Sequence, residues 1–403
     1  MRQNGFTKQE RERIKRLYET VLERIYTAHI KPFPDFPEPV FLISDAYPGV
    51  WLEHAYDAVS FAQFDPAMAP VAVNQMRLFL THQKQDGQLP CYVIDTSKSD
   101  AYRNTVRYAQ IQECVSFTML CLKTYELTAD QAFLSYAYER CQKWDRWLCD
   151  HRMTLNTGLI ELFCGFDTGH DFSTRFEGIS FGYPEDAVKA GGLPEPLPLL
   201  APDMNAVFYA SRAALSRMAA LLDKPDEAQA WQGRAEQVKQ KLFQLCYCPQ
   251  DAFFYDVDRQ GRFRKHLSIH ITSLFEEHVL DDEEAGTIYH RHLRSPDEFW
   301  TPFPFPSMAV ADPGFARTRA GNCWSFYSQG LTALRCLLWM DDYGFGEDLE
   351  RLMSQWVRAL SAPGPSPFSQ ELDPFTGERS NSSEWYSSAM LFFIHAVRRL
   401  GLD

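Results

Sequence analysis

The chain has 403 residues with 53 acidic and 40 basic side chains, which gives a formal net charge of −13. An acidic chain without a basic block is a poor partner for nucleic acid or for an anionic membrane surface, so we expect neither partner. Hydrophobic residues make up 45% of the chain and aromatic residues 14%. This composition is enough for a large core and also suits a cleft that binds sugars.

The chain shows no targeting or membrane signal. Its N-terminal stretch lacks the apolar region of a signal peptide, and no run of about 18 apolar residues predicts a membrane span. The 10 cysteines do not have the spacing of a disulfide framework or of a zinc site. We therefore expect a cytoplasmic, reduced protein, and the sequence leaves its oligomeric state open.

Helical periodicity dominates the chain. Apolar residues recur on one helical face from Ile14 to Tyr26, and again from Ala228 to Leu242 in a segment that Pro225 opens. Strand-like alternation is short, and the best case is the predicted hairpin arm from Phe253 to Val257. Periodic segments predict about twelve helices. They lie roughly at residues 6–29, 48–63, 66–84, 106–127, 129–152, 203–223, 226–245, 267–278, 281–293, 323–342, 345–361 and 383–400.

The joins between these helices alternate in length. Every second join has about two to four residues, whereas the others have roughly 10 to 50 and are rich in Gly, Pro, Asp and aromatic residues. Short joins make antiparallel helix neighbours, so all the long joins would emerge at one end of the bundle. This pattern predicts an all-α (α/α)6 barrel, a closed ring of six helical hairpins with its binding site on one rim. No change in composition divides residues 1–403, so we expect a single domain.

One long join contains DTGHDFSTRF, residues 167–176. Gly169 permits a sharp turn between Asp167 and Asp171, which could direct Asp171 into a cleft with Arg175 nearby. The structural alternative is an Asx-turn, in which the two aspartates cap backbone N–H groups.

A second carboxylate-rich stretch, SQELDPFTGE at residues 369–378, lies in the last long join. In the barrel both stretches would reach the same rim. Two carboxyl groups across a cleft are what glycoside hydrolysis requires, because one protonates the leaving oxygen and the other activates water. The alternative is an ordinary β-turn formed by Pro374 and Gly377.

DTGHDFSTRF resembles the E-S-G-W-D-F-S-S-R-W signature of trehalases. It is equally similar to the E-S-G-x-D-N-S-P-R stretch of their clan relatives, the processing α-glucosidases and the mannosylglycerate and glucosylglycerate hydrolases. The resemblance implies an (α/α)6 barrel and inversion at the anomeric carbon. It places the general acid on Asp171 and the signature arginine on Arg175, which we expect to hold substrate or a neighbouring carboxylate.

Other segments resemble motifs of the same clan. Residues 51–56, with FDPAMA and QKQDGQLP after them, resemble its opening W-D-S-x-F, D-P and Q-x-x-D-G-x-x-P series. PDMNA, residues 202–206, resembles V-D-x-N-A, and Gln110 fits the clan's Q-P-P position. Tryptophan faces can also stack on sugar rings, although core packing is the alternative for each. The substrate-binding residues predicted on these grounds are Trp51, Glu53, Gln110, His170, Arg175, Asn205, Trp324 and Trp385.

The last motif resembles E-x-Y-x-P-x-T-G, which carries the clan's catalytic base. An ungapped match on DPFTG places Gln370 at the base position, whereas a one-residue deletion places Glu371 there. We expect Glu371 to be the base, because a glutamine cannot accept a proton from water. In the ungapped register another base is needed, such as Glu378 or Glu384.

The leading hypothesis is an inverting, exo-acting α-glycoside hydrolase for a small soluble α-glucoside or related glycoside. One alternative is a sugar isomerase or epimerase on the same barrel, which would use paired histidines such as His54, His170 and His270. The other is a carbohydrate-binding protein without turnover. His266 and His270 have no third ligand at metal-site spacing, and the chain has no nucleotide-binding fingerprint, so we expect no metal and no cofactor.

Overall fold

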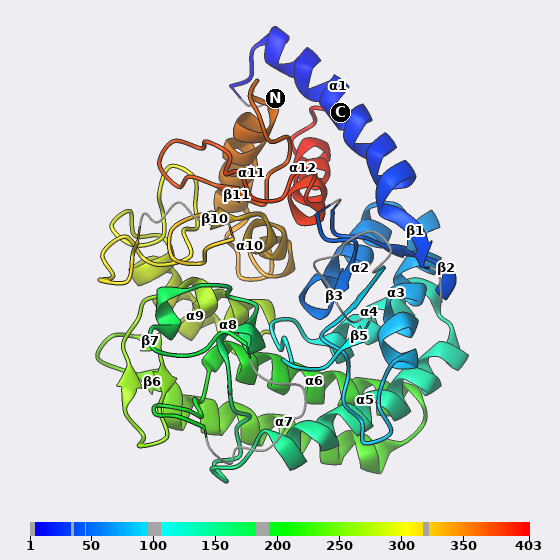
Figure 1. The fold of residues 1–403 in the computed structure, drawn as a ribbon, viewed down its shortest axis with the longest axis vertical. Helices are drawn as coiled ribbons and strands as arrows, with labels where there is room; N and C mark the ends of the chain where they lie inside the picture. Colours follow the sequence, from blue (N-terminus) through cyan, green and yellow to red (C-terminus); the bar gives the residue numbers. More distant parts are fainter. Residues whose placement is uncertain (1–4, 34–35, 45, 96–105, 183–192, 317–321) are drawn as a thin grey trace.

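The computed structural model describes residues 5–33, 36–44, 46–95, 106–182, 193–316 and 322–403. These residues form twelve α-helices (Figure 1). The helices are α1 (Lys8–Arg24), α2 (Ala55–Phe64), α3 (Ala69–Thr81), α4 (Phe117–Thr128), α5 (Gln131–His151), α6 (Pro202–Leu221), α7 (Pro225–Cys246), α8 (Thr272–Glu276), α9 (Asp282–Ile288), α10 (Gly330–Arg335), α11 (Gly346–Ser361) and α12 (Ser387–Arg399).

The even-numbered helices form the inner ring. α12 packs against α2 and α10, α2 against α4, α4 against α6, and α6 against α8. The odd-numbered helices lie outside them; α3, for example, contacts both α2 and α4. Because α12 contacts α2, the end of the chain closes the ring that its beginning opens. This arrangement confirms the predicted (α/α)6 barrel.

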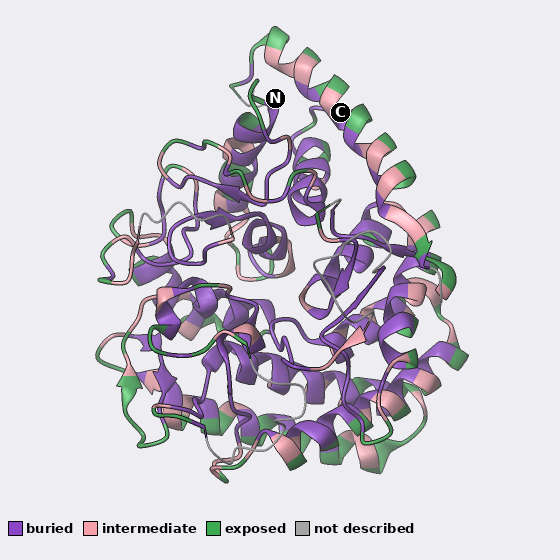
Figure 2. Ribbon diagram, in the orientation of Figure 1, coloured by how far each residue is buried: buried purple, intermediate pink, exposed green. Residues whose placement is uncertain are grey.

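The helices of the two rings differ in how far they are buried, as Figure 2 shows. On the outer helix α7 the buried residues are spaced three or four apart, from Trp231 through Ala235 and Val238 to Leu242. This is the single apolar face that the sequence predicts. On the inner helix α6 most residues are buried on all sides, because it packs against α4, α5, α7 and α8.

Short antiparallel strands lie in the connections between the helices. A three-stranded sheet has the order β3 (Gly49–Trp51), β4 (Tyr92–Ile94) and β5 (Val106–Arg107), and it aligns Trp51, Tyr92 and Arg107. β10 (Ser328–Gln329) pairs with β11 (Glu371–Leu372). The remaining pairs are β1 (Ile30–Phe33) with β2 (Phe36–Phe41), β6 (Tyr247–Cys248) with β7 (Phe253–Phe254), and β8 (Asp256–Val257) with β9 (Phe263–Arg264). The predicted strand at 253–257 is thus confirmed as β7 and β8.

Three inner helices begin seven or more residues later than the sequence predicts. The segments expected at 48–63, 106–127 and 323–342 begin as strands and loops, and their α-helices start only at Ala55, Phe117 and Gly330. The apolar pattern continues into these loops because Ile111 and Val115 are buried without being helical. Their backbones form sheet pairs and turns instead, and these turns line the site described below.

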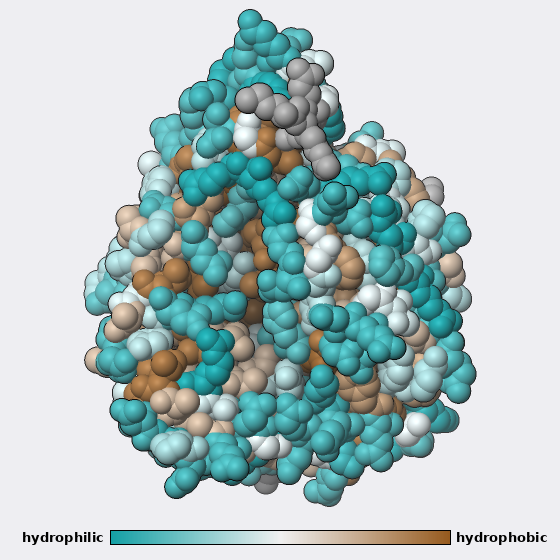
Figure 3. Space-filling view, turned by 180° about the vertical axis from the view of Figure 1, so that it is seen from behind, coloured by the Kyte–Doolittle hydropathy of each residue, from teal (hydrophilic) through white to brown (hydrophobic). Residues whose placement is uncertain are grey.

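One cluster of buried apolar side chains extends from Phe6 to Leu402 among the described residues. It supports the proposal that residues 1–403 form one domain. Hydrophilic residues cover most of the face shown in Figure 3, where a central hollow exposes some hydrophobic ones. In the part of the chain that the structure describes, we find no helix whose length and hydropathy would let it span a bilayer.

Candidate active site

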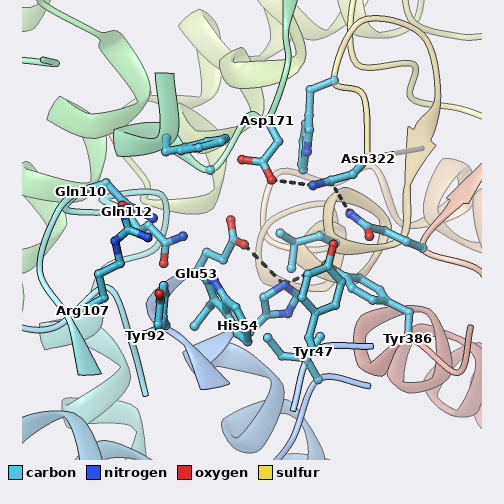
Figure 4. Close-up of a pocket in the computed structure, with 17 residues that line it drawn as sticks. Tyr47, Glu53, His54, Tyr92, Arg107, Gln110, Gln112, Asp171, Asn322 and Tyr386 are labelled. Carbon is cyan, nitrogen blue, oxygen red and sulfur yellow. Dashed lines mark hydrogen bonds and ion pairs between the residues drawn. The ribbon is translucent and has the colours of Figure 1, made fainter. Parts of the chain in front are cut away.

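A cavity of about 270 Å³ lies among the long loops of the barrel (Figure 4). Aromatic rings, carboxyl groups and amides line it, and they come from several separate parts of the chain. The main lining residues are Tyr47, Trp51, Glu53, His54, Tyr92, Arg107, Gln110, Gln112, Asp171, Asn322, Trp324, Gln370 and Tyr386. Such a mixture of aromatic faces and converging polar groups is typical of a small-molecule site.

The DTGHDFSTRF turn holds Asp171 at the cavity. Asp167 is fully buried, where it accepts hydrogen bonds from the backbone N–H groups of Ile111 and Phe163 and forms an ion pair with Arg152. Gly169 then takes φ +71°, which reverses the chain so that Asp171 faces the cavity. Both interpretations of this stretch are therefore found, but for different residues. Asp167 accepts hydrogen bonds from backbone N–H groups and anchors the turn, whereas Asp171 lines the cavity.

The carboxyl group of Asp171 favours its protonated form. Burial raises the pKa of Asp171 well above its usual value, and the negative charges of Glu53 and Glu371 raise it further. A hydrogen bond of 2.5 Å from Asn322 Nδ2 to Asp171 Oδ2 acts in the opposite direction. A carboxyl group that stays protonated near neutral pH can act as a general acid.

Glu53 supplies a second carboxyl group to the same cavity. Its Oε2 packs so closely on the Gly169 backbone that a Cβ at residue 169 would lie 2.2 Å from it. Burial raises the pKa of Glu53, whereas the nearby His54, whose Nε2 lies 3.7 Å from Glu53 Oε1, lowers it. His54 in turn contacts Asp57 at 3.1 Å and the hydroxyl of Tyr386 at 2.8 Å. Glu53 and Asp171 are directed toward one another in Figure 4.

The structure brings Gln370, and not Glu371, to the cavity. Neighbouring residues of a strand point to opposite sides, and Glu371 is fully buried in β11. Its Oε1 accepts hydrogen bonds of 3.0 Å from the Cys323 backbone and from Gln329 Nε2. Glu371 therefore lies outside the cavity lining and Gln370 inside it, and the role of Glu371 as the base stays a prediction.

Neither of the other carboxylates considered for the base lines this cavity. Glu378 lines a separate cavity with Arg358 and Arg379, and Glu384 is exposed to solvent. Glu53 and Asp171 are thus the carboxyl groups that the described residues bring to the site.

Of the predicted substrate-binding residues, Trp51, Glu53, Gln110 and Trp324 line the cavity. His170 is buried behind it and stacks on Trp324, with ring centroids 4.4 Å apart. Burial lowers the pKa of His170 to about 3, so its imidazole is neutral where it stacks on the Trp324 ring.

The other three predicted substrate-binding residues do not line the cavity. Arg175 is buried and forms ion pairs with Asp203 at 2.7 Å and with Asp256 at 2.6 Å, so it holds neighbouring carboxylates, the other role expected for it. Asn205 is fully buried and uses its side chain to bind the backbone of Ile160.

Trp385 packs against Phe368 and under the guanidinium group of Arg24. Polar and aromatic residues of the motifs thus also build the scaffold, where buried polar groups need partners.

The paired histidines of the isomerase alternative are not assembled. Only His54 of the three candidates lines the cavity, because His170 lies behind Trp324 and His270 is buried with its Nε2 3.0 Å from the Phe254 carbonyl oxygen. Sequence reasoning missed Asn322 and Tyr386, which both line the cavity. Asn322 lies in a loop with no periodic signal, and Tyr386 directly precedes α12, where apolar periodicity explains an aromatic residue equally well.

Residues 47–388 match the family described as "Mannosylglycerate hydrolase MGH1-like glycoside hydrolase domain". The chain belongs to this family of glycoside hydrolases. The match spans most of the chain and includes both carboxylate-rich stretches. It confirms the resemblance to the clan of trehalases and mannosylglycerate hydrolases.

Solved structures show the same fold. The GH63 mannosylglycerate hydrolase from Thermus thermophilus, crystallised with glucose, superposes with a TM-score of 0.74 at 17% identity and covers 96% of this chain and 100% of its own. Neutral trehalase from Saccharomyces cerevisiae gives 0.66 at 12% identity, covering 95% and 81%. An uncharacterized protein of Borreliella burgdorferi is 25% identical over 127 residues, which is 31% of this chain and 26% of that protein. The chain thus spans about a quarter of the length of this curated relative.

Proposed function

We propose that this glycoside hydrolase removes a terminal sugar from a small soluble α-glucoside or related glycoside, with inversion, in the cytoplasm. The observation that carries the proposal is Asp171, a carboxyl group whose pKa burial raises, on the wall of a cavity lined by aromatic and amide side chains. The cavity of about 270 Å³ is slightly below the usual range of about 300–1,000 Å³ for ligand sites. This size favours a disaccharide or a glycosylated small molecule over a polymer.

Asp171 is the proposed general acid. Bond cleavage places negative charge on the leaving oxygen, and the protonated carboxyl of Asp171 neutralises this charge by donating its proton. The low polarity that burial creates keeps the proton on Asp171 until the substrate needs it. Trp51 and Trp324 offer aromatic faces to the sugar ring, and Gln110 offers an amide to its hydroxyl groups.

The geometry favours Glu53 over Glu371 as the group that takes the proton from the attacking water. Glu53 shares the cavity with Asp171, and a pKa raised by burial makes its carboxylate a stronger base than one in water. Glu371 does not line the cavity, and its Oε1 accepts a hydrogen bond from the Cys323 backbone, although its charge raises the pKa of Asp171. Glu371 as the base is the alternative that the same experiment tests.

The test is sugar release from a panel of trehalose, kojibiose, nigerose, maltose, isomaltose, glucosylglycerate and mannosylglycerate, with NMR to identify the anomer released first. Wild type is compared with Glu53→Gln and Glu371→Gln. Glu378→Gln is the matched control, because Glu378 belongs to the same hairpin as Glu371 but lines another cavity. We expect inversion, inactive Glu53→Gln and active Glu371→Gln. Retention of configuration would contradict the mechanism, and an inactive Glu371→Gln beside an active Glu53→Gln would return the base to Glu371.

A second candidate function is carbohydrate binding without turnover. The observation that favours it is Gln370, a neutral amide that faces the cavity where the resemblance places the base carboxylate. Calorimetry with the same panel distinguishes the two functions. A sugar that binds wild type and is never cleaved would support the second.

A further inference from the structure

We propose that Asn322 and Gln370 are positioning residues that keep the acid proton of Asp171 on the oxygen that faces the substrate. The inference rests on the proposed role of Asp171 as general acid. Two hydrogen bonds carry it: Gln370 Nε2 donates to Asn322 Oδ1 at 2.8 Å, and Asn322 Nδ2 donates to Asp171 Oδ2 at 2.5 Å. All three side chains line the cavity.

The direction of this chain determines where the proton is. A side-chain amide has one donor end and one acceptor end, so an Asn322 that accepts from Gln370 must present its NH₂ group to Asp171. The Oδ2 atom of Asp171 then accepts a hydrogen bond, and a carbonyl oxygen accepts more strongly than a hydroxyl oxygen does. A neutral Asp171 therefore keeps its proton preferentially on Oδ1, the oxygen without a dashed line in Figure 4.

The opposite direction would disable the acid. If both amides were turned, the carbonyl oxygen of Asn322 would face Asp171 and accept its O–H group. The proton would then point at the wall of the cavity instead of at the leaving oxygen of the glycoside. The orientation of the Asn322 and Gln370 amides therefore determines whether a protonated Asp171 can donate its proton to the leaving oxygen.

The backbone holds both amides in place. Asn322 takes φ +57°, a conformation that asparagine adopts more readily than most residues. Two residues further on, the Trp324 N–H donates to the Asp171 carbonyl at 3.0 Å, so the Asn322 loop is tied directly to the acid. Gln370 is fixed on both sides, because its N–H donates to Ser383 and its carbonyl accepts from Gly330.

This geometry gives a physical reason for glutamine at position 370. A glutamate there could only accept, so it would take the NH₂ group of Asn322 and turn the carbonyl of Asn322 toward Asp171. It would also add a negative charge near a carboxyl group that Glu53 and Glu371 already influence. A neutral amide at position 370 therefore keeps the NH₂ group of Asn322 directed at Asp171 and adds no charge beside it.

The experiment uses the full chain and the substrate that the panel identifies. The variants are Gln370→Glu, which reverses the amide chain, and Asn322→Gly, which removes the donor but keeps the positive φ accessible. Each is compared with wild type and with Glu378→Gln, after thermal melts show that it is folded.

We expect Gln370→Glu to lower kcat about 10- to 100-fold with a small change in KM, because the acid is misdirected but the sugar still binds. Asn322→Gly should lower kcat similarly. It should also move the basic limb of the kcat/KM profile to higher pH, since the Asn322 bond lowers the pKa of Asp171. Faster hydrolysis by Gln370→Glu would overturn the proposal, because it would show that a base belongs at 370. An unshifted pH profile in Asn322→Gly would also overturn it, because Asn322 would then be only structural.

A measurement without substrate separates this proposal from the proposed function. The infrared band of protonated Asp171 is obtained as the difference between wild type and Asp171→Asn. A band that titrates near or above neutral pH, and that moves in Asn322→Gly, supports both the protonated acid and its positioning by Asn322. No such band would refute the protonated acid itself, whereas a band that Asn322→Gly leaves unmoved would refute only the positioning by Asn322.

Discussion

Gly169 allows Glu53 to reach the turn that carries Asp171, because a Cβ at position 169 would lie only 2.2 Å from Glu53 Oε2. Gly169 also has φ +71°, so both space and backbone conformation require glycine. Glu53 can therefore lie against this turn only because residue 169 has no side chain.

Replacing Gly169 with alanine should displace Glu53 and strain the turn. We expect a loss of about 1–3 kcal/mol in the free energy of unfolding and a fall in activity of tenfold or more. Gly178→Ala is the matched control, because Gly178 has φ +80° but open space around it. Urea unfolding and sugar release measure both variants. Equal effects of the two substitutions would show that contact with Glu53 does not matter.

Arg175 should matter for stability rather than for substrate affinity. It is buried between Asp203 and Asp256, so removing it leaves two carboxylates without their cation. We expect Arg175→Met to cost about 3–5 kcal/mol in unfolding free energy. The control Arg217→Met breaks an exposed pair with Glu126 and should cost about 0–1 kcal/mol. A stable Arg175→Met enzyme with a raised KM would instead restore the substrate-binding role.

Two buried glutamates should make the fold more stable in mild acid. Burial raises the pKa of Glu113 to about 8, and it raises that of Glu277 to about 8 as well. Both carboxyls are neutral in the folded state where the unfolded chain ionises, so stability falls as pH rises from about 4.5 to about 8.

Glu113→Gln should remove part of this loss, on the order of a few kcal/mol, because an amide cannot ionise. Urea unfolding at pH 6 and pH 9 measures the slope. Glu139→Gln, an exposed substitution on α5, is the control and should leave the slope as in wild type. An unchanged slope in Glu113→Gln would show that this group does not cause it.

The barrel could be predicted because its signals are repeated along the whole chain. Apolar faces such as Trp231 to Leu242 recur at helical spacing, and the alternation of short and long joins leaves few topologies open. The late starts of α2, α4 and α10 could not be predicted, because buried residues such as Ile111 continue the apolar pattern through loops. Apolar periodicity indicates which residues are buried. Because a loop that packs into the core is also buried, periodicity alone cannot show where the helix begins.

The candidate site was only partly predictable for a related reason. A motif shows that a polar residue belongs to the site region, but it does not show which way the side chain points. Asp171 faces the cavity whereas Arg175 faces the wall, although both belong to one motif. For Gln370 and Glu371 a shift of one residue along a strand exchanges the cavity for the core.

The central claim is that Asp171 protonates the leaving oxygen, and leaving-group dependence in Asp171→Asn tests it most directly. The variant is assayed on the natural glycoside and on a dinitrophenyl glycoside of the same sugar, whose leaving group needs no proton. We predict a loss of about 10²–10⁴-fold in kcat on the natural glycoside and a much smaller loss on the activated one. Equal losses on both substrates, or a wild-type rate on the natural glycoside, would contradict the assignment of Asp171 as the acid.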